Sequence, residues 1–347
     1  MEGNRMSTWH ELLKIMTDAD VIGIISSVIL ITGLGYVLTA MHIFSSQFEN
    51  EISRLVLVVS VPALSFVSFM QPMNPKEIQQ GLMLIILGFV LYIILLVISP
   101  FVYWCVHDTD QRRVLGIITT FGSTTVFGIP IAGAIYGSQG VIYASLFNMA
   151  YRILLYTYVY IRMAKQQITI HQILKVLANP IVLATFLGLF CWLYQPLAPK
   201  VIVGKHMITF YRIDITAPWL YQPLKYLASL AAPLSWLLIG CTMGAQRSLK
   251  ASLIDPLTWY YGIQKSFLVP AICLGATLAG RIIGLDSISL TGIASITILM
   301  SSPTSTIPVI YSLNYHQYPL MTAKCSIVSN ITSIIALPFW LIILKMI

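Results

Sequence analysis

The chain has 347 residues, of which 57% are hydrophobic and only 9% are charged. Charged residues usually make up about a quarter of a soluble domain, so this composition excludes a soluble or disordered protein. The formal net charge of +8 is scattered between long apolar segments, which is typical of loop charges in a multispanning membrane protein. We therefore expect the lipid bilayer as a partner and no nucleic acid.

Residues 1–20 are polar and mixed in charge, unlike a cleaved signal peptide with its basic start and apolar core. The first span is therefore expected to direct insertion. Each of the five cysteines lies in a different apolar segment, and no Cys-x-x-Cys pair occurs. We expect buried thiols, no metal site and no cofactor.

The apolar segments predict an all-α membrane protein, because a spanning helix needs about 20 mostly apolar residues and a β-barrel would show short alternating segments. The predicted spans are 21–41, 52–72, 80–104, 114–137, 140–162, 173–194, 223–245, 258–280, 289–313 and 321–344. Residues 114–151 and 287–323 contain no Asp, Glu, Lys or Arg and are too long for one span. We expect turns at 137–140 and 314–317, where residues typical of turns occur.

The fourth and ninth spans carry Gly, Ser, Thr and Pro near their centres, at 121–130 and 301–308. The second and seventh spans also match, with Pro62-Ala-Leu-Ser65 against Pro233-Leu-Ser235. This pattern predicts two five-helix repeats, 21–162 and 173–344, joined by a short loop at 163–172. Because each repeat has an odd number of spans, the second repeat enters the membrane from the opposite side. Inverted repeats with broken helices are typical of transporters. The alternative is that each proline only kinks its helix for packing.

All twelve acidic residues lie outside the predicted spans or at their margins, whereas three basic residues lie within them. Arg152 is central in the fifth span, Lys265 is a third of the way into the eighth, and Lys324 is near the end of the tenth. A central cation costs roughly 2.5–3.5 kcal/mol on insertion scales. An anionic substrate or an anion-lined path would offset that free energy. The alternatives are bonds to helix-terminal carbonyls for Arg152 and snorkelling of Lys324.

No Asp, Glu or His lies near the centre of a span, which disfavours a membrane enzyme. His42, His107 and His316 lie close to span ends. The same absence favours uniport, or proton coupling through a group that the sequence does not identify. A sodium site built from carbonyls and hydroxyls stays open. A seven-helix receptor is disfavoured by the span count and by the repeat.

These motifs resemble the auxin efflux carrier family, which includes plant PIN-FORMED auxin exporters and bacterial malate permease-like proteins. The resemblance covers residues 21–344 and rests on the following segments in this order: Arg54 with 61–66 in the second span, Gly128-Ile-Pro130 and Tyr136-Gly137 in the fourth, Asn179-Pro180 opening the sixth, and Pro303-Thr304 with Pro308 in the ninth. Arg152 and Lys265 fall where many members carry basic residues. One departure is Ser123, where members often have asparagine, so the substrate's identity does not carry over.

The resemblance implies a fold like that of bile-acid sodium symporters, with crossed broken helices 4 and 9. Helices 1, 2, 6 and 7 would form a scaffold, and helices 3–5 and 8–10 a transport domain that moves as an elevator. Family substrates are carboxylates. The polar stretch 196–222 is longer than the family pattern implies, and is expected to be a solvated loop or, alternatively, a cap or partner surface.

The predicted function is alternating-access transport of a small organic anion, auxin- or malate-like. The alternatives are a sodium-coupled organic-acid symporter and a non-transporting sensory or interaction protein on the same fold. Half-helix ends at Pro130 and Pro303 are expected to direct their positive dipole ends toward a carboxylate. Hydroxyl groups and cations would surround this carboxylate. Asn148 would either orient Arg152 or reach the substrate. The candidate substrate-binding residues are Pro62, Ser65, Ser123, Thr124, Gly128, Pro130, Asn148, Arg152, Lys265, Ser302, Pro303 and Thr304.

The distribution of Lys and Arg in short loops favours both termini outside a plasma or inner membrane. The inside loops would hold Arg54, Arg112, Arg113, Arg162, Lys165, Lys175, Arg247 and Lys250, and the outside would hold Arg5, Lys14, Lys76, Arg281 and Lys345. When the basic residues of the long 196–222 loop are counted as outside, the excess of Lys and Arg in the inside loops nearly disappears. The oligomeric state is open, with a homodimer as one alternative.

Overall fold

The computed structural model describes residues 19–72, 75–165, 178–203, 206–245, 249–282 and 288–347. Most of the N-terminal segment 1–20, most of the loop 163–172 and the start of the span 173–194 lie outside these residues, as do Arg5, Lys14, Lys175 and Arg247. Six helical stretches among the described residues are long and apolar enough to cross a membrane: Gln47–Ser68, Gln79–Val102, Thr124–Ala164, Pro218–Gly244, Pro256–Arg281 and Pro319–Met346. Shorter apolar helices cover Ser26–Ala40, Pro180–Leu193 and Leu290–Met300. The fold is that of a multi-pass helical membrane protein.

The first half of the chain forms helices at each predicted span. These are α2 (Ala19–Ala40), α3 (Ser46–Leu55), η1 (Val56–Ser60), α4 (Val61–Ser68), α5 (Pro75–Val102), α6 (Thr109–Thr120), η2 (Thr124–Gly128), α7 (Ile129–Leu154), η3 (Leu155–Val159) and α8 (Tyr160–Ala164). Within α7 the backbone of Gly137 is not helical (φ 60°, ψ −149°). A positive φ suits glycine, so the predicted turn at 137–140 is a sharp change of direction at this residue.

The second half contains a β-hairpin in addition to its helices. Its elements are α10 (Pro180–Leu193), β1 (Lys200–Val203), β2 (His206–Thr209), α11 (Ile213–Thr216), α12 (Pro218–Ser229), α13 (Ala231–Gly244), α14 (Leu249–Ile254), α15 (Pro256–Ile263), η4 (Gln264–Leu268), α16 (Val269–Ile282), α17 (Leu290–Met300), α18 (Thr306–Asn314) and α19 (Pro319–Met346). The expected turn at 314–317 falls between α18 and α19, as the sequence predicts. Within the stretch 196–222, which was expected to be a solvated loop, β1 and β2 pair antiparallel with Lys200 opposite Thr209.

Of the four π-helical segments in the described part of the chain, three end two residues before a proline. The segments η1, η2 and η4 precede Pro62, Pro130 and Pro270. Proline lacks an N–H and its ring clashes with the carbonyl four residues earlier, and the wider π turn relieves that clash within a continuous helix. Pro62 and Pro130, which appear to break spans in the sequence, therefore sit inside helices that continue.

Polar side chains cap the helices where the sequence changes from polar to apolar. Asn179 accepts a hydrogen bond from the amide of Ile181 and begins α10 as the predicted Asn-Pro opening of the sixth span. Asp108, Asp255 and Ser289 cap α6, α15 and α17 in the same way. Each cap satisfies amides that the first helical turn leaves without an intrahelical partner.

The helices α2 and α13 pack with their backbones in contact. A Cβ at Gly35 would lie 2.3 Å from the carbonyl oxygen of Leu237, and one at Gly240 would lie 2.0 Å from that of Thr32. Such close approach is possible only for residues without a side chain, and small residues drive helix association in membranes.

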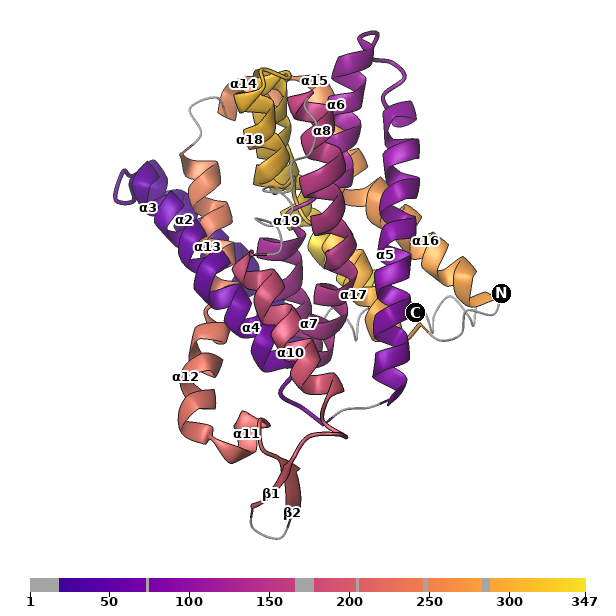
Figure 1. Cartoon of the computed structure of the whole chain (residues 1–347). Coiled ribbons are helices and arrows are strands. Elements are labelled where there is room, and N and C mark those ends of the chain that lie inside the picture. Colours follow the sequence, from indigo (N-terminus) through magenta and orange to yellow (C-terminus); the bar gives the residue numbers. More distant parts are fainter. Residues whose placement is uncertain (1–18, 73–74, 166–177, 204–205, 246–248, 283–287) are drawn as a thin grey trace, which may run out of the picture.

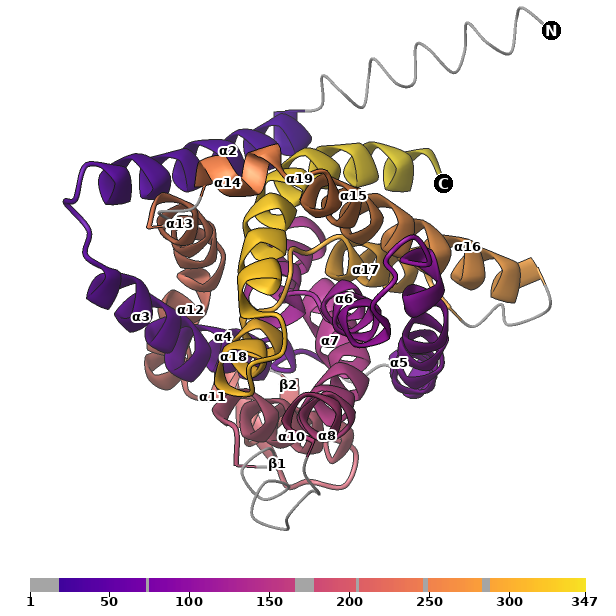
Figure 2. The same ribbon diagram turned by 90° about the horizontal axis from the view of Figure 1, so that it is seen from above.

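The helices fall into three groups when the molecule is viewed along its long axis. In Figure 2, α2, α3, α12 and α13 lie on one side, α5 and α16 on the other, and α6, α7, α17 and α18 between them. Figure 1 shows the hairpin at the lower end and α6, α8, α14 and α15 at the upper end. A large buried apolar cluster includes Tyr92 of α5, Phe147 of α7 and Phe121, which directly follows α6. The interrupted helices therefore meet inside the protein.

Candidate functional site

Two interrupted helices meet at their breaks in the centre of the molecule. The first break separates α6 from η2, and the second separates α17 from α18. Gly122 and Thr304 form an isolated antiparallel bridge. The amide of Ser123 donates a 2.6 Å hydrogen bond to the carbonyl of Pro303, and the amide of Ser305 donates one of 3.1 Å to that of Phe121. Each break thus satisfies backbone groups that the other leaves free, which a membrane interior requires.

Side chains from α7 and α19 hold the two breaks in place. Thr124 donates a 2.6 Å hydrogen bond to Oδ1 of Asn148, whose Nδ2 donates one of 2.9 Å to Thr125. In the second break, the amide and the hydroxyl of Thr304 donate to Oγ of Ser329, at 3.0 and 2.8 Å. Both polar ends of the Asn148 amide therefore bind the first break, and this residue supports the crossover instead of orienting Arg152 as expected.

A cavity of about 140 Å³ lies beside the crossover. One wall comes from the crossover and the helices that hold it: Ser123, Thr125, Val126, Tyr151, Arg152, Tyr156, Pro303, Thr304, Ser305, Thr306, Ile307, Ser326 and Asn330. The opposite wall comes from α3, η1, α10 and α13, with Asn179 at the start of α10: Ser53, Leu57, Asn179, Ile181, Leu238, Ile239 and Thr242. The cavity therefore lies between two groups of helices.

Two helices begin at this cavity, although not where the sequence suggested. The expectation of half-helix ends at Pro130 and Pro303 is wrong, because the helices begin at Thr124 and Thr306. Pro130 lies just beyond the π turn of η2, within a helix already under way, and Pro303 belongs to the break itself. The first amides of a helix have no intrahelical partner and carry a partial positive charge. Both helices thus present this end to the cavity.

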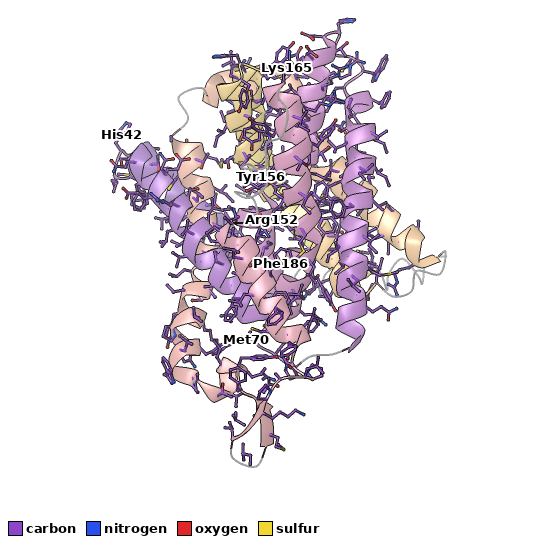
Figure 3. All side chains as sticks on the ribbon, viewed as in Figure 1. His42, Met70, Arg152, Tyr156, Lys165 and Phe186 are labelled. Atoms are coloured by element: carbon purple, nitrogen blue, oxygen red, sulfur yellow. The ribbon has the colours of Figure 1, made fainter. Side chains whose placement is uncertain are left out.

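Arg152 supplies a full charge to the same cavity. Its side chain is only 5% exposed, and neither Nη1 nor Nη2 has a hydrogen-bond partner among the described residues. Ion pairs between two described residues include Arg113–Asp110, Arg212–Asp214 and Lys324–Asp255, and Arg152 is in none of these. In Figure 3, Arg152 and Tyr156 lie at mid-height in the molecule. A buried guanidinium without a carboxylate favours an anion beside it.

Lys265 is the second buried cation predicted from the sequence, and it lies behind the crossover. It is fully buried on η4, and its Nζ has no hydrogen-bond partner within the described part of the chain. A Cβ at Gly122 would lie 2.8 Å from this Nζ and 2.4 Å from Oγ of Ser302. The Lys265 side chain is outside the set that lines the cavity, and it lies next to the crossover at Gly122. Lys324 instead pairs with Asp255 at 3.3 Å near a helix end.

The structure brings four of the predicted site residues to the cavity: Ser123, Arg152, Pro303 and Thr304. It places the other eight in the packed surroundings: Pro62, Ser65, Thr124, Gly128, Pro130, Asn148, Lys265 and Ser302. Gly128, for example, packs against α17, where a Cβ would come within 2.9 Å of the Leu299 side chain. Pro62 and Ser65 are buried in α4, and Ser53 and Leu57 take the expected position on the opposite wall.

Asn330 and Ser326 line the cavity but were missed from the sequence. They lie on α19 four residues apart, the same spacing as Asn148 and Arg152 on α7. Residues four apart share a face of a helix. A comparison of the fifth and tenth spans for paired polar residues would have found them.

A multi-pass helical fold, with two interrupted helices crossing beside a cavity that a buried arginine lines, is typical of a membrane transport protein. The chain belongs to the membrane transport protein family, whose profile matches residues 20–341, and this match confirms the resemblance to the auxin efflux carriers. No curated protein matches the sequence.

Proposed function

We propose that the protein is a secondary transporter that binds a small organic anion, a carboxylate, in the cavity beside the crossover. The observation that carries this proposal is the Arg152 guanidinium, which is buried and has no hydrogen-bond partner for either terminal nitrogen among the described residues. A carboxylate would accept two parallel hydrogen bonds from it. Ser123 would donate from the crossover, whereas the Thr304 hydroxyl already donates to Ser329. The amides at the starts of η2 and α18 would add their partial positive charge.

The volume of the cavity supports a small substrate. Sites for drug-sized ligands usually enclose about 300–1,000 Å³, and this cavity encloses about 140 Å³. The apolar side chains of Leu57, Val126 and Ile307 leave room for a short hydrocarbon part next to the anionic group. A short-chain mono- or dicarboxylate fits these features best.

The transport movement that we propose is an elevator-type displacement of a transport domain past a scaffold, within two inverted five-helix repeats. The division of the cavity walls supports it, since α3, η1, α10 and α13 form one wall and the crossover with α7 and α19 the other. The close backbone contact of α2 with α13 suits a scaffold that stays rigid. The bonds that join the two breaks suit a domain that moves as one body.

Sodium coupling at the crossover is disfavoured by Lys265. Its Nζ lies beside Gly122 and Ser302, where carbonyl and hydroxyl oxygens would otherwise be the ligands for a cation. A lysine ammonium group has only donors and repels a second cation. We propose sodium-independent transport, and replacement of sodium by choline in the flux assay is expected to leave the rate unchanged. A rate that requires sodium would establish the symporter alternative.

The central test is carboxylate binding and uptake by the purified full-length protein. A thermal-shift screen of mono- and dicarboxylates identifies the ligand, and proteoliposomes then measure its flux. Arg152→Ala is expected to abolish binding and flux, and Arg152→Lys to weaken both, because lysine keeps the charge without the planar pair of donors. Arg281→Ala, at the end of α16, is the control and is expected to behave like the unmodified protein.

Three results would overturn the proposal. They are a preference for organic cations or neutral sugars, unchanged anion binding by a folded Arg152→Ala variant, and anion binding without any flux. The last result would favour the sensory or interaction alternative on the same fold.

A further inference from the structure

A second, larger cavity lies away from the crossover. It encloses about 640 Å³ between α5, α6 and the η3–α8 segment. These elements meet at the upper end of the molecule in Figure 1, and Lys165, which lines the cavity, marks the same end in Figure 3. Its volume falls within the range of small-molecule sites. The cavity plays no part in the transport function proposed above.

Four cations line this cavity: Arg112, Arg113, Arg162 and Lys165. Arg113 forms an exposed ion pair with Asp110 at 3.2 Å, the one acidic residue in the lining. Arg112 is held by neutral carbonyls, since its Nε and Nη2 donate to Val106 at 3.2 and 2.8 Å. Neither Arg112 nor Arg162 is in an ion pair among the described residues. The cavity thus keeps an excess of positive charge.

Arg162 is held by an aromatic ring. Its guanidinium carbon lies 5.5 Å from the centre of the Tyr158 ring, a contact that orients the cation without neutralising it. Arg112 and Arg162 come from α6 and α8, so two fixed cations face one space from different helices.

The opposite part of the cavity is apolar and faces outward. Leu96, Pro100 and Phe101 contribute from the end of α5, a candidate membrane span, and Ile161 contributes from α8. Phe101 is 71% exposed and Ile161 is 41% exposed. Exposed apolar side chains on a spanning helix contact acyl chains. The cavity therefore joins a cationic upper part to an apolar, lipid-facing wall.

We propose that this cavity binds an anionic phospholipid, with its phosphate among Arg112, Arg162 and Lys165 and an acyl chain along Phe101 and Ile161. Basic pockets between transmembrane helices are suited to acidic headgroups. The apolar wall selects the lipid over a free phosphate, because a soluble anion would leave Phe101 and Ile161 uncovered. Arg113, already paired with Asp110, contributes less.

Native mass spectrometry of the full-length protein in detergent tests the proposal. Phosphatidylglycerol and phosphatidylcholine with identical acyl chains are compared, and glycerol 3-phosphate and inorganic phosphate serve as headgroups without chains. We expect phosphatidylglycerol to bind at least tenfold more tightly than phosphatidylcholine and the soluble phosphates to bind negligibly. Equal binding of both lipids, or tight binding of a soluble phosphate, would overturn the assignment.

Charge-removing variants locate the site. Arg162→Gln combined with Lys165→Gln is expected to lower the affinity for phosphatidylglycerol about tenfold, and Lys165→Gln alone to lower it by a smaller factor. Both side chains are exposed, and the thermal midpoint in phosphatidylcholine verifies folding. Lys200→Gln, on β1 at the opposite end, is the matched control. Retained affinity in the double variant, or an equal loss in the control, would show that the cavity is not the site.

Discussion

The hydroxyl of Tyr151 donates a 2.8 Å hydrogen bond to Oγ of Ser305. Tyr151 directly precedes Arg152 on α7, whereas Ser305 belongs to the break between α17 and α18. The ring of Tyr151 also packs against Tyr92 and Phe121, with centroid distances of 5.9 and 5.6 Å. This one contact ties the helix that carries the cavity's cation to the crossover segment from the other half of the chain.

The Tyr151–Ser305 bond is testable by Tyr151→Phe, which keeps the packed ring and removes the hydroxyl. We expect a loss of about 0.5–1.5 kcal/mol in unfolding free energy, the net contribution of a neutral hydrogen bond. Anion affinity should fall by up to about tenfold, because 1.4 kcal/mol corresponds to a factor of ten. Thermal unfolding and ligand titration measure the two effects.

A double-mutant cycle with Ser305→Ala isolates this bond. The effects of Tyr151→Phe and Ser305→Ala should be less than additive. Tyr226→Phe, at a residue 71% exposed on α12, is the control and should change neither quantity. Fully additive effects of the two substitutions would show that the bond does not couple them.

Glycine substitutions on α2 test the packing of α2 against α13. Gly35→Ala would place a Cβ 2.3 Å from the Leu237 carbonyl oxygen, and such overpacking typically costs about 1–3 kcal/mol. Gly33→Ala is the matched control on the same helix, because a Cβ at Gly33 has nothing within 4 Å. We expect a lower thermal midpoint for Gly35→Ala alone. Equal midpoints would contradict the backbone contact.

The tight space between the crossover and Lys265 is testable by Gly122→Ala. The new Cβ would lie 2.4 Å from Oγ of Ser302 and 2.8 Å from Nζ of Lys265. We expect a destabilisation of about 1–3 kcal/mol together with a loss of anion binding, since the bridge to Thr304 must shift. Combining Gly122→Ala with Ser302→Gly removes the nearest atom, so the double variant should recover part of the stability and part of the anion binding. Gly275→Ala, with open space around its Cβ, is the control.

A fourth prediction concerns pH and the contact between the turn after α18 and the start of α6. The hydroxyl of Tyr318 donates to Oδ2 of Asp108, whose Oδ1 accepts from the amides of Asp110 and Gln111. The bond to Asp108 raises the pKa of Tyr318 to about 12. The bond from Tyr318, with those from the two amides, lowers the pKa of Asp108.

The signs of these shifts fix two pH windows. The pKa of Tyr318 in the folded protein exceeds its ordinary value near 10. Its contribution to the stability of the fold is therefore complete below about pH 10 and is lost as the pH rises through about 12. The Asp108 contribution is complete above its ordinary pKa near 3.9 and is lost as the pH falls through its lower folded value. Tyr318→Phe should therefore lower the thermal midpoint at pH 7 and leave no difference above pH 12. A difference that persists at the highest pH would contradict this account.

The spans and the breaks could be predicted from the sequence because both depend on local composition. Continuous apolar segments predict α5 and α19 directly, and Ser-Pro-Thr at 302–304 marks the second break. The exact start of each half-helix could not be predicted. A proline reads as a break in a sequence, yet the π turn before Pro130 lets the helix continue through it.

The cavity lining could be predicted only in part, because the composition of a buried helix does not show which of its faces points toward the cavity. Arg152 is conspicuous as a cation in an apolar span, and it does line the cavity. Lys265 is equally conspicuous, but it lies next to Gly122 and Ser302 and does not line the cavity. Thr242 and Asn330 look ordinary in the sequence, and long-range packing alone brings them to the wall.

The bridge between Gly122 and Thr304 has a consequence for biosynthesis. The two strands of this bridge come from opposite halves of the chain, and the ribosome releases the first half well before residues 301–305 exist. During that interval the amide of Ser123 and the carbonyl of Phe121 lack the partners that they have in the finished protein. The break in the fourth span of the nascent first half therefore has unsatisfied backbone groups at this stage. The binding cavity can assemble only after the C-terminal half has been inserted.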